Sequence, residues 1–140
     1  MNYWLMCLPR ANLEHCMKVG TFGLARKHVL GSVAKGGPVV CCAGKGDWKI
    51  IGYGEATSDY YVDDKKVFLK DGYFVDRFDF SSEKLGSNQE VDIMQIIDRL
   101  EFVKNLAYWA VFFRNGIVKM SKRDWELTMK QVAQPGVSLK

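Results

Sequence analysis

The chain has 140 residues, of which 48% are hydrophobic, and a formal net charge of +4. This length suits one domain spanning residues 1–140, and the apolar content excludes a disordered chain. The longest apolar run, 106–113, is shorter than the roughly 18 residues that span a bilayer, and the N-terminus lacks a secretory signal. We therefore expect no membrane association.

The charge is unevenly distributed along the chain. Residues 1–60 carry a net charge of +3, residues 61–100 carry −3 and residues 101–140 carry +4. The two basic ends would form one positive face if the fold brings them together, which would suit an anionic partner. An ordinary scatter of charged side chains over the protein surface explains the same three net charges.

The first part of the chain predicts a strand, a helix and a second strand. The apolar segment 2–8 predicts the first strand. Asn12 is a suitable N-cap for a short helix over 13–18, which ends at Gly20. The apolar segment 38–43, which contains two of the four cysteines, predicts a buried strand.

The remainder predicts three strands, a long loop and a closing helix. Three segments are apolar or alternate in polarity and predict strands: 48–58, 73–80 and 108–113. The polar segment 59–72 predicts a long loop, and loops of this length are often functional. Ser121 predicts the N-cap of a helix over 122–133. Five or six strands without regular helical crossovers indicate an α+β, mostly β fold, built as a small mixed barrel.

The cysteines and the missing enzyme motifs limit the chemistry. The four cysteines lack the spacing of a zinc site, so we expect free thiols, a reducing cytoplasm, and no metal or cofactor. No nucleophile elbow, phosphate-binding loop or zinc-protease motif is present, which favours a protein that is not an enzyme. A catalytic role for Cys7 or Cys16 is a weaker alternative. Several aromatic residues lie in predicted loops, where they could stack on bases or pack against the core and the loops of the protein itself.

The order of motifs resembles the EVE family of small archaeal and bacterial proteins. The matching motifs run through nearly the whole chain: Tyr3-Trp4-Leu5, Phe22-Gly23-Leu24, 51–63, 100–105 and Asp124-Trp125. That family has a PUA-like β-barrel and is related to the YTH domain, which recognises methylated adenine in RNA. The resemblance implies a PUA-like mixed barrel of five to six strands, with short helices covering its openings.

The resemblance also implies a pocket for a modified base at one barrel opening. Phe22 matches an aromatic wall that is usually Trp, and Asn12 matches an amide residue that reads the base. Tyr61 or Phe68 matches a second aromatic wall. The full set implied for the base pocket is Asn12, Phe22, Gly23, Leu24, Tyr61 and Phe68. Arg114 lies in a turn, Arg114-Asn115-Gly116, that resembles an Arg-Asp-Gly turn contacting phosphate in the YTH relatives. Lys27 is the second expected phosphate contact, because it would rim the same pocket as Arg114 in the barrel that the resemblance implies.

The resulting hypothesis is a non-catalytic binding module for a modified, methylated base in RNA or DNA. We expect it to be a cytoplasmic monomer. An alternative is a small-molecule or nucleotide-binding regulatory protein that uses the same pocket. A third, weaker alternative is an enzyme acting on a modified base, with Cys7 or an acidic residue as its catalyst.

Overall fold

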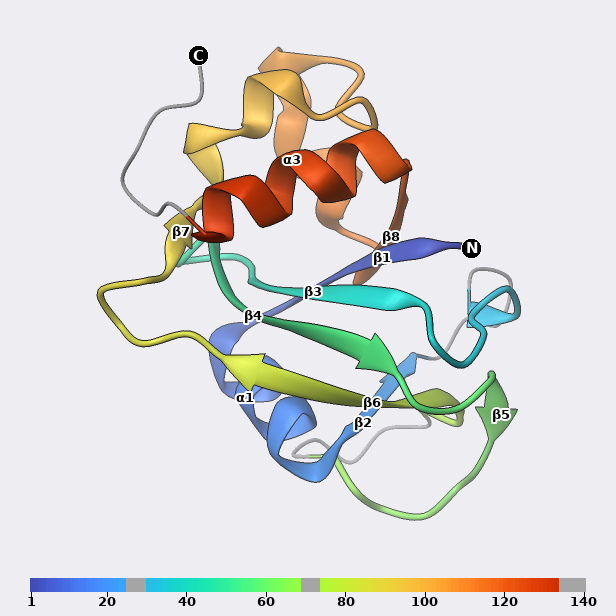
Figure 1. Ribbon diagram of the computed structural model, residues 1–140. Coiled ribbons are helices and arrows are strands. Elements are labelled where there is room, and N and C mark those ends of the chain that lie inside the picture. Colours follow the sequence, from blue (N-terminus) through green and yellow to red (C-terminus); the bar gives the residue numbers. More distant parts are fainter. Residues whose placement is uncertain (25–29, 69–73, 134–140) are drawn as a thin grey trace.

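A curled sheet forms the centre of the computed structural model, which describes residues 1–24, 30–68 and 74–133 (Figure 1). Its strands follow the order β2-β6-β4-β3-β1-β8, with β5 paired to β6 and β7 paired to β4. The strands are β1 (Tyr3–Leu8), β2 (Thr21–Leu24), β3 (Pro38–Ala43), β4 (Lys49–Ala56), β5 (Tyr61–Val62), β6 (Asp76–Lys84), β7 (Val91–Asp92) and β8 (Ile117–Met120). The β1–β3 pair is parallel and the other pairs are antiparallel. The predicted α+β, mostly β class is confirmed, and the sheet curls into a half-barrel.

Two apolar cores lie on the two faces of this sheet. Helix α1 (Arg10–Val19) packs on one face, and helix α3 (Lys122–Ala133) packs on the other with the 3-10 helices η1 (Ile93–Gln95), η2 (Ile97–Arg99) and η3 (Leu106–Phe113) (Figure 1). Neighbouring residues of β3 alternate between the cores, with Cys41 in one and Cys42 in the other. Burial on both faces explains why this strand reads as a continuous apolar run.

The two ends of the chain lie side by side in the sheet. Strand β1 pairs with β8 in antiparallel register, which places Trp4 opposite Lys119. The first and last segments are therefore neighbours, as a basic face built from both ends would require. Within the described ranges, no helix is long and apolar enough to cross a membrane.

Helix α1 begins earlier than the sequence predicts. Its N-cap is Pro9, which makes no side-chain capping hydrogen bond, and Asn12 lies inside the first turn. The prediction of Asn12 as the cap is wrong because Pro9 fixes its own φ and already separates the strand from the helix. The predicted end is confirmed: Gly20 adopts a left-handed φ of 76° and donates its N–H to the carbonyl of Cys16.

The apolar segment predicted as a strand over 108–113 is also different. It belongs to η3, which Asn105 caps by accepting a hydrogen bond from the N–H of Ala107. Trp109 and Phe113 pack edge to face with Trp48, at centroid distances of 4.8 Å and 5.6 Å. An eight-residue apolar run fits a strand or a packed helix, so periodicity alone could not decide.

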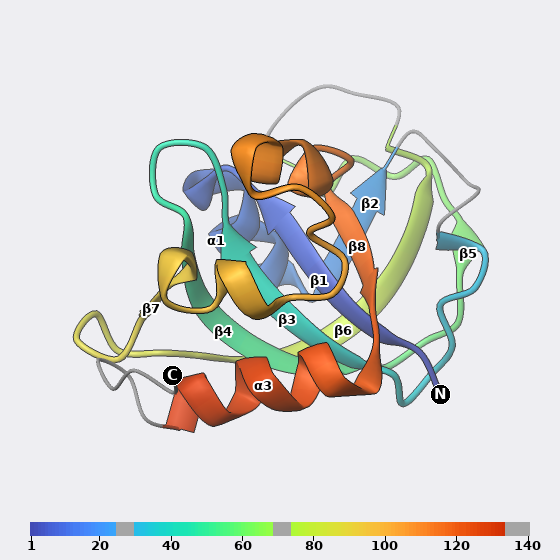
Figure 2. The same ribbon diagram turned by 90° about the horizontal axis from the view of Figure 1, so that it is seen from above.

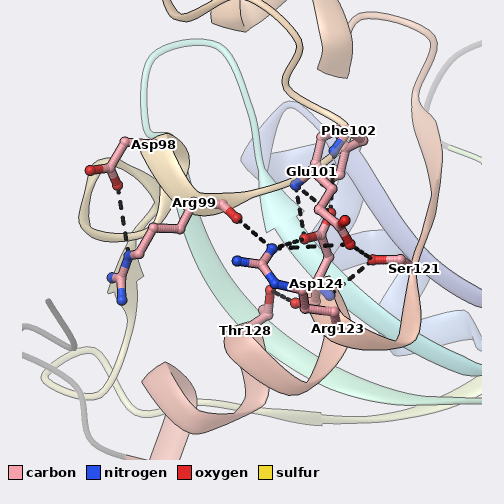
Figure 3. A network of polar contacts seen from close by, with 8 residues as sticks. All are labelled: Asp98, Arg99, Glu101, Phe102, Ser121, Arg123, Asp124 and Thr128. Atoms are coloured by element: carbon pink, nitrogen blue, oxygen red, sulfur yellow. Dashed lines mark hydrogen bonds and ion pairs between the residues drawn. The ribbon is translucent and has the colours of Figure 1, made fainter.

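A buried carboxylate joins α3 to the segment that precedes η3 (Figure 3). Asp124 is 0% exposed, and its two oxygens accept hydrogen bonds from the N–H of Glu101 at 2.9 Å and 2.8 Å. The N–H of Phe102 donates to the same carboxylate at 3.3 Å. The N–H of Asp124 in turn donates to the Ser121 hydroxyl at 3.1 Å, which confirms the predicted helix cap.

We expect Asp124→Asn to lower the free energy of unfolding by about 1–2 kcal/mol. The amide keeps one acceptor oxygen but turns an NH₂ group toward N–H donors that need a partner. The measurement is urea denaturation followed by far-ultraviolet circular dichroism. Glu126→Gln, on the exposed side of the same helix, is the control and should change stability by less than about 0.5 kcal/mol. Equal effects of the two substitutions would contradict the role of the buried carboxylate.

Candidate functional site

A cavity of about 70 Å³ lies where α1, the end of β2 and the segment between β5 and β6 meet. Two aromatic rings, two polar side chains and otherwise apolar groups enclose it: Leu8, Asn12, His15, Cys16, Gly23, Leu24, Phe68 and Phe74. None of these described lining residues is acidic. Several of them are only half-buried, so the cavity opens to solvent. The chemistry it offers is an apolar, aromatic slot with a few neutral hydrogen-bonding groups.

Asn12 presents an unused amide to this cavity. The residue is half-buried, and its side chain has no hydrogen-bond partner among the described residues. Pro9 begins the helix without it, so the amide does not serve as a cap. A primary amide carries both donors and an acceptor, and can therefore pair with the edge of a planar ligand.

Phe68 and Phe74 form the aromatic side of the cavity. Their rings pack edge to face with centroids 5.9 Å apart. Phe68 lies against the backbone of Gly23, where a Cβ atom would stand only 2.7 Å from the ring. A glycine at this position of β2 therefore lets the aromatic ring approach the strand closely.

The side chains of Arg77 and His15 hold Phe68, Phe74 and the neighbouring backbone in position. The Arg77 guanidinium, whose residue is 3% exposed, lies 5.0 Å from the centroid of the Phe68 ring and donates from Nε to the carbonyl of Phe74 at 2.9 Å. It also donates from Nη2 to the carbonyl of Lys65. The His15 ring donates from Nε2 to the carbonyl of Val67 at 2.6 Å. The aromatic segment is thus tied to both α1 and β6.

Four of the six residues predicted for the base pocket line this cavity: Asn12, Gly23, Leu24 and Phe68. The other four lining residues were not predicted for the pocket: Leu8, His15, Cys16 and Phe74. His15 stands three residues after Asn12, a spacing that places both on one helix face and could have revealed it. Phe74 carried no comparable signal, because it precedes β6 and alternates in phase with Phe78 and Phe80, which lie in the core.

Phe22 does not line the cavity, so its prediction as an aromatic wall is corrected. It pairs with Phe78 across the β2–β6 register, and the two ring centroids are 5.5 Å apart in the core. Tyr61 is also absent from the lining: its hydroxyl donates to the Asp79 carboxylate at 2.6 Å. Burial, with this hydrogen bond, raises the pKa of Tyr61 to about 12.

The two predicted phosphate contacts have different outcomes. Lys27 lies outside the described residues. Arg114 is exposed and lines a groove beside the cavity, and the groove and the cavity share Leu8 as a wall. The turn that follows Arg114 reaches the cavity wall as well, since a Cβ atom on Gly116 would lie 2.9 Å from Leu24 Cδ2. The structure therefore brings Arg114 next to the cavity.

All four cysteines are buried and free, as predicted for Cys41 and Cys42. Cys7 lies opposite Cys42 in the β1–β3 register, and its interaction with the Cys42 thiol lowers the pKa of Cys7. Burial raises the pKa of Cys16 to about 11 and that of Cys41 to about 12. Within the part of the chain that the structure describes, no three His, Cys, Asp or Glu residues gather into a potential metal site.

We expect iodoacetamide at pH 9 to alkylate Cys7 before the other thiols. The thiolate is the reactive form, and the Cys42 thiol lowers the pKa of Cys7, whereas burial raises the pKa of Cys16 to about 11 and that of Cys41 to about 12. Cys7 also lines the groove that Arg114 lines, whereas Cys41 is 0% exposed. Peptide mapping by mass spectrometry measures the order of labelling. Cys7→Ser should remove the fast label, and faster labelling of Cys16 would contradict this account.

Comparison with known proteins identifies the fold. No protein-family model matches the chain. The chain is 27% identical to UPF0310 protein PH1033 of Pyrococcus horikoshii, over 93% of this chain and 98% of that protein.

Solved structures agree on the architecture. The structure of Rpa0253 from Rhodopseudomonas palustris matches with a TM-score of 0.67 at 13% identity, over 100% of this chain and 99% of that chain. The Mmi1 YTH domain matches with a TM-score of 0.64 at 14% identity, over 94% of this chain and 88% of that chain. The same domain has also been solved in complex with RNA. This chain therefore has a YTH-like fold.

Proposed function

We propose that the protein is a non-catalytic, cytoplasmic module of the EVE type that binds a modified base of RNA or DNA in the cavity. The observation that carries this proposal is the Asn12 amide, which has no hydrogen-bond partner among the described residues, in the same cavity lining as the Phe68 and Phe74 rings. The similarity in fold to a YTH domain that has been solved with RNA supports it.

The chemistry of the cavity suits a flipped, neutral base. A base that leaves its stack loses a few kcal/mol, and contact with aromatic side chains returns about 1–3 kcal/mol. The Asn12 amide can pair with the base edge. A methyl group that fills the apolar part adds about 0.8 kcal/mol, or roughly a fourfold preference. Because no described lining residue is acidic, a cationic modification gains no ion pair.

The size of the cavity sets how the base enters. A dry cavity of about 150 Å³ accepts a benzene ring, whereas this cavity measures about 70 Å³. A base therefore enters with its edge through the open side, and full insertion requires the Phe68 segment to move outward. The hydrogen bonds from His15 and Arg77 to this segment oppose that movement.

A binding screen tests the proposal. Fluorescence anisotropy would measure the affinity of RNA and DNA oligonucleotides that each carry one modified base, against the unmodified sequences. We expect one modification to bind at least about fourfold more tightly, and Asn12→Ala to remove that preference. Identical affinities across the whole panel would contradict the proposal.

The aromatic rings and the amide of the cavity also suit a second candidate, a regulatory protein that binds a free modified nucleoside or nucleotide in the same place. Titration with free nucleosides separates the two: equal affinity for the nucleoside and the oligonucleotide supports this candidate. An enzyme is less favoured because the described residues that line the cavity include no carboxylate, and their one thiol, Cys16, has its pKa raised by burial to about 11. Cys7, the catalyst considered for an enzyme, lines the neighbouring groove and not the cavity. Mass analysis of a bound oligonucleotide over time would reveal any conversion.

A further inference from the structure

The four cysteines form two pairs on opposite faces of the sheet. Cys7 and Cys42 lie in the core that α3 covers, whereas Cys16 and Cys41 lie in the core that α1 covers. Cys7 and Cys42 are also register partners on the parallel strands β1 and β3, which run side by side in the view from above (Figure 2). Since both side chains project from the same face of the sheet, the two thiols are neighbours.

The backbone spacing of Cys7 and Cys42 suits a disulfide. Neighbouring strands lie about 4.8 Å apart, within the roughly 4.4–6.8 Å that a disulfide requires between its Cα atoms. Two thiols on one face at this spacing can join without separation of the strands. Cys41 cannot replace Cys42, because successive residues of a strand alternate between faces and Cys41 lies in the opposite core.

One thiol of this pair reaches solvent and the other does not. Cys7 is 7% exposed and lines the groove beside the cavity, which measures about 450 Å³, whereas Cys42 is 0% exposed. Gly44 borders the Cys7 sulfur: a Cβ atom on this glycine would lie 3.0 Å from Sγ, closer than an ordinary van der Waals contact. The absence of a side chain at this position leaves the sulfur accessible to a molecule as small as a peroxide.

The surroundings of the two sulfurs give them different roles. The interaction between them lowers the pKa of Cys7, and the same interaction, together with burial, raises the pKa of Cys42. Lys45 and Arg114 line the groove with Cys7, and neither forms an ion pair with a described acidic residue. Positive charge nearby favours a thiolate. Cys7 therefore suits the attacking thiolate, and Cys42 suits the thiol that resolves the product.

We propose that Cys7 and Cys42 are a redox pair, which a small peroxide such as hydrogen peroxide converts into a disulfide. The Cys7 thiolate attacks one peroxide oxygen, the O–O bond breaks, and the other oxygen leaves as hydroxide and takes up the proton that Cys7 had released. The Cys42 sulfur then attacks the Cys7 sulfenic acid, so that the S–S bond forms and the S–O bond breaks. The departing hydroxide takes the Cys42 proton. The two thiols lose two electrons, which reduce one peroxide to two waters.

The disulfide would close a loop that contains α1 and β2. These two elements supply most of the cavity lining, so oxidation would tie their ends together without placing a new group in the cavity. Other thiols reduce such a disulfide by exchange, which makes the modification reversible. Neither Cys7 nor Cys42 lines the cavity, and the redox pair therefore does not depend on the proposed binding of a base.

The experiment exposes the reduced protein to hydrogen peroxide and then blocks the remaining thiols with N-ethylmaleimide under denaturing conditions. Mass spectrometry of the unreduced peptides identifies the cysteines that have joined. We expect the peptide that carries Cys7 to be linked to the peptide that carries Cys42, and dithiothreitol should separate the two. The protein should remain a single chain on a non-reducing gel, because the link forms within one molecule.

Two adjacent positions of β3 provide matched variants. Cys42→Ala should abolish the link and leave a Cys7 sulfenic acid, which dimedone traps. Cys41→Ala removes an equally buried thiol from the opposite face and should form the link within about twofold of the native rate. Gly44→Ala should slow the loss of the Cys7 thiol at least about threefold, because its Cβ atom crowds the sulfur. Circular dichroism checks that each variant is folded.

Several results would overturn the redox pair. They are a link from Cys7 to Cys16 or Cys41, a link that persists in Cys42→Ala, oxidation of Cys7 that yields only links between chains, and no oxidation of Cys7 at peroxide concentrations that oxidise glutathione. Loss of the link in Cys41→Ala as well as in Cys42→Ala would count equally against it. If Gly44→Ala does not fold, the comparison of the two β3 variants still decides.

Discussion

Replacing Phe22 with alanine is expected to lower the free energy of unfolding by about 3–5 kcal/mol. The residue is 0% exposed, and its ring packs against Phe78 in the core between β2 and β6. Removing the ring leaves a void that surrounding strands cannot close. Urea denaturation measures the effect, with Val62→Ala as the control because that side chain is 65% exposed on β5 and should lose less than about 0.5 kcal/mol.

The resemblance to the EVE family implies the opposite result for Phe22. If its ring were a wall of the base pocket, Phe22→Ala would keep its stability and lose binding. A variant that unfolds at the same urea concentration as the native protein would therefore contradict the position of Phe22 in the core. A variant that is destabilised but still binds through the cavity would support the structure.

Replacing Phe68 with alanine is expected to weaken binding of a modified oligonucleotide about tenfold to a hundredfold. Contact between an aromatic side chain and a base contributes about 1–3 kcal/mol. The ring is half-buried at the cavity, so we expect the variant to remain folded. Fluorescence anisotropy measures the affinity, and circular dichroism confirms the fold.

Phe112→Ala is the matched control for Phe68. It removes a half-buried phenylalanine from η3 that lines neither the cavity nor the groove. We expect its affinity for the oligonucleotide to stay within about twofold of the native value. Unchanged affinity of Phe68→Ala, or equal losses in both variants, would count against the aromatic cavity as the binding site.

Local sequence signals predicted the elements that carry either a capping residue or a continuous apolar run. The helix over 122–133 follows from Ser121, whose hydroxyl accepts the hydrogen bond expected of a cap. Strand β3 follows from an apolar run buried on both faces. The prediction failed at 108–113, because the aromatic residues there pack edge to face against a distant tryptophan, a tertiary contact that the local pattern does not contain.

The candidate site was only partly predictable because it depends on how distant strands meet. The resemblance selected Asn12 and Phe68, but the sequence could not show that the pairing of β2 with β6 turns Phe22 into the core. Along β6, Arg77 alternates with the core residues Phe78 and Phe80, a pattern that is typical of an exposed side chain. It is in fact buried, because backbone carbonyls and the Phe68 ring surround its guanidinium.

The most direct test of the central claim is a nuclear magnetic resonance titration of the isotope-labelled protein with the modified oligonucleotide that binds best. The account predicts that the largest shift changes occur at the Asn12 side-chain amide, the Leu24 methyl groups and the Phe68 ring. These three groups line the same cavity and come from separate elements. Unchanged signals from all three, with shifts concentrated on the opposite face around Trp125, would contradict the account.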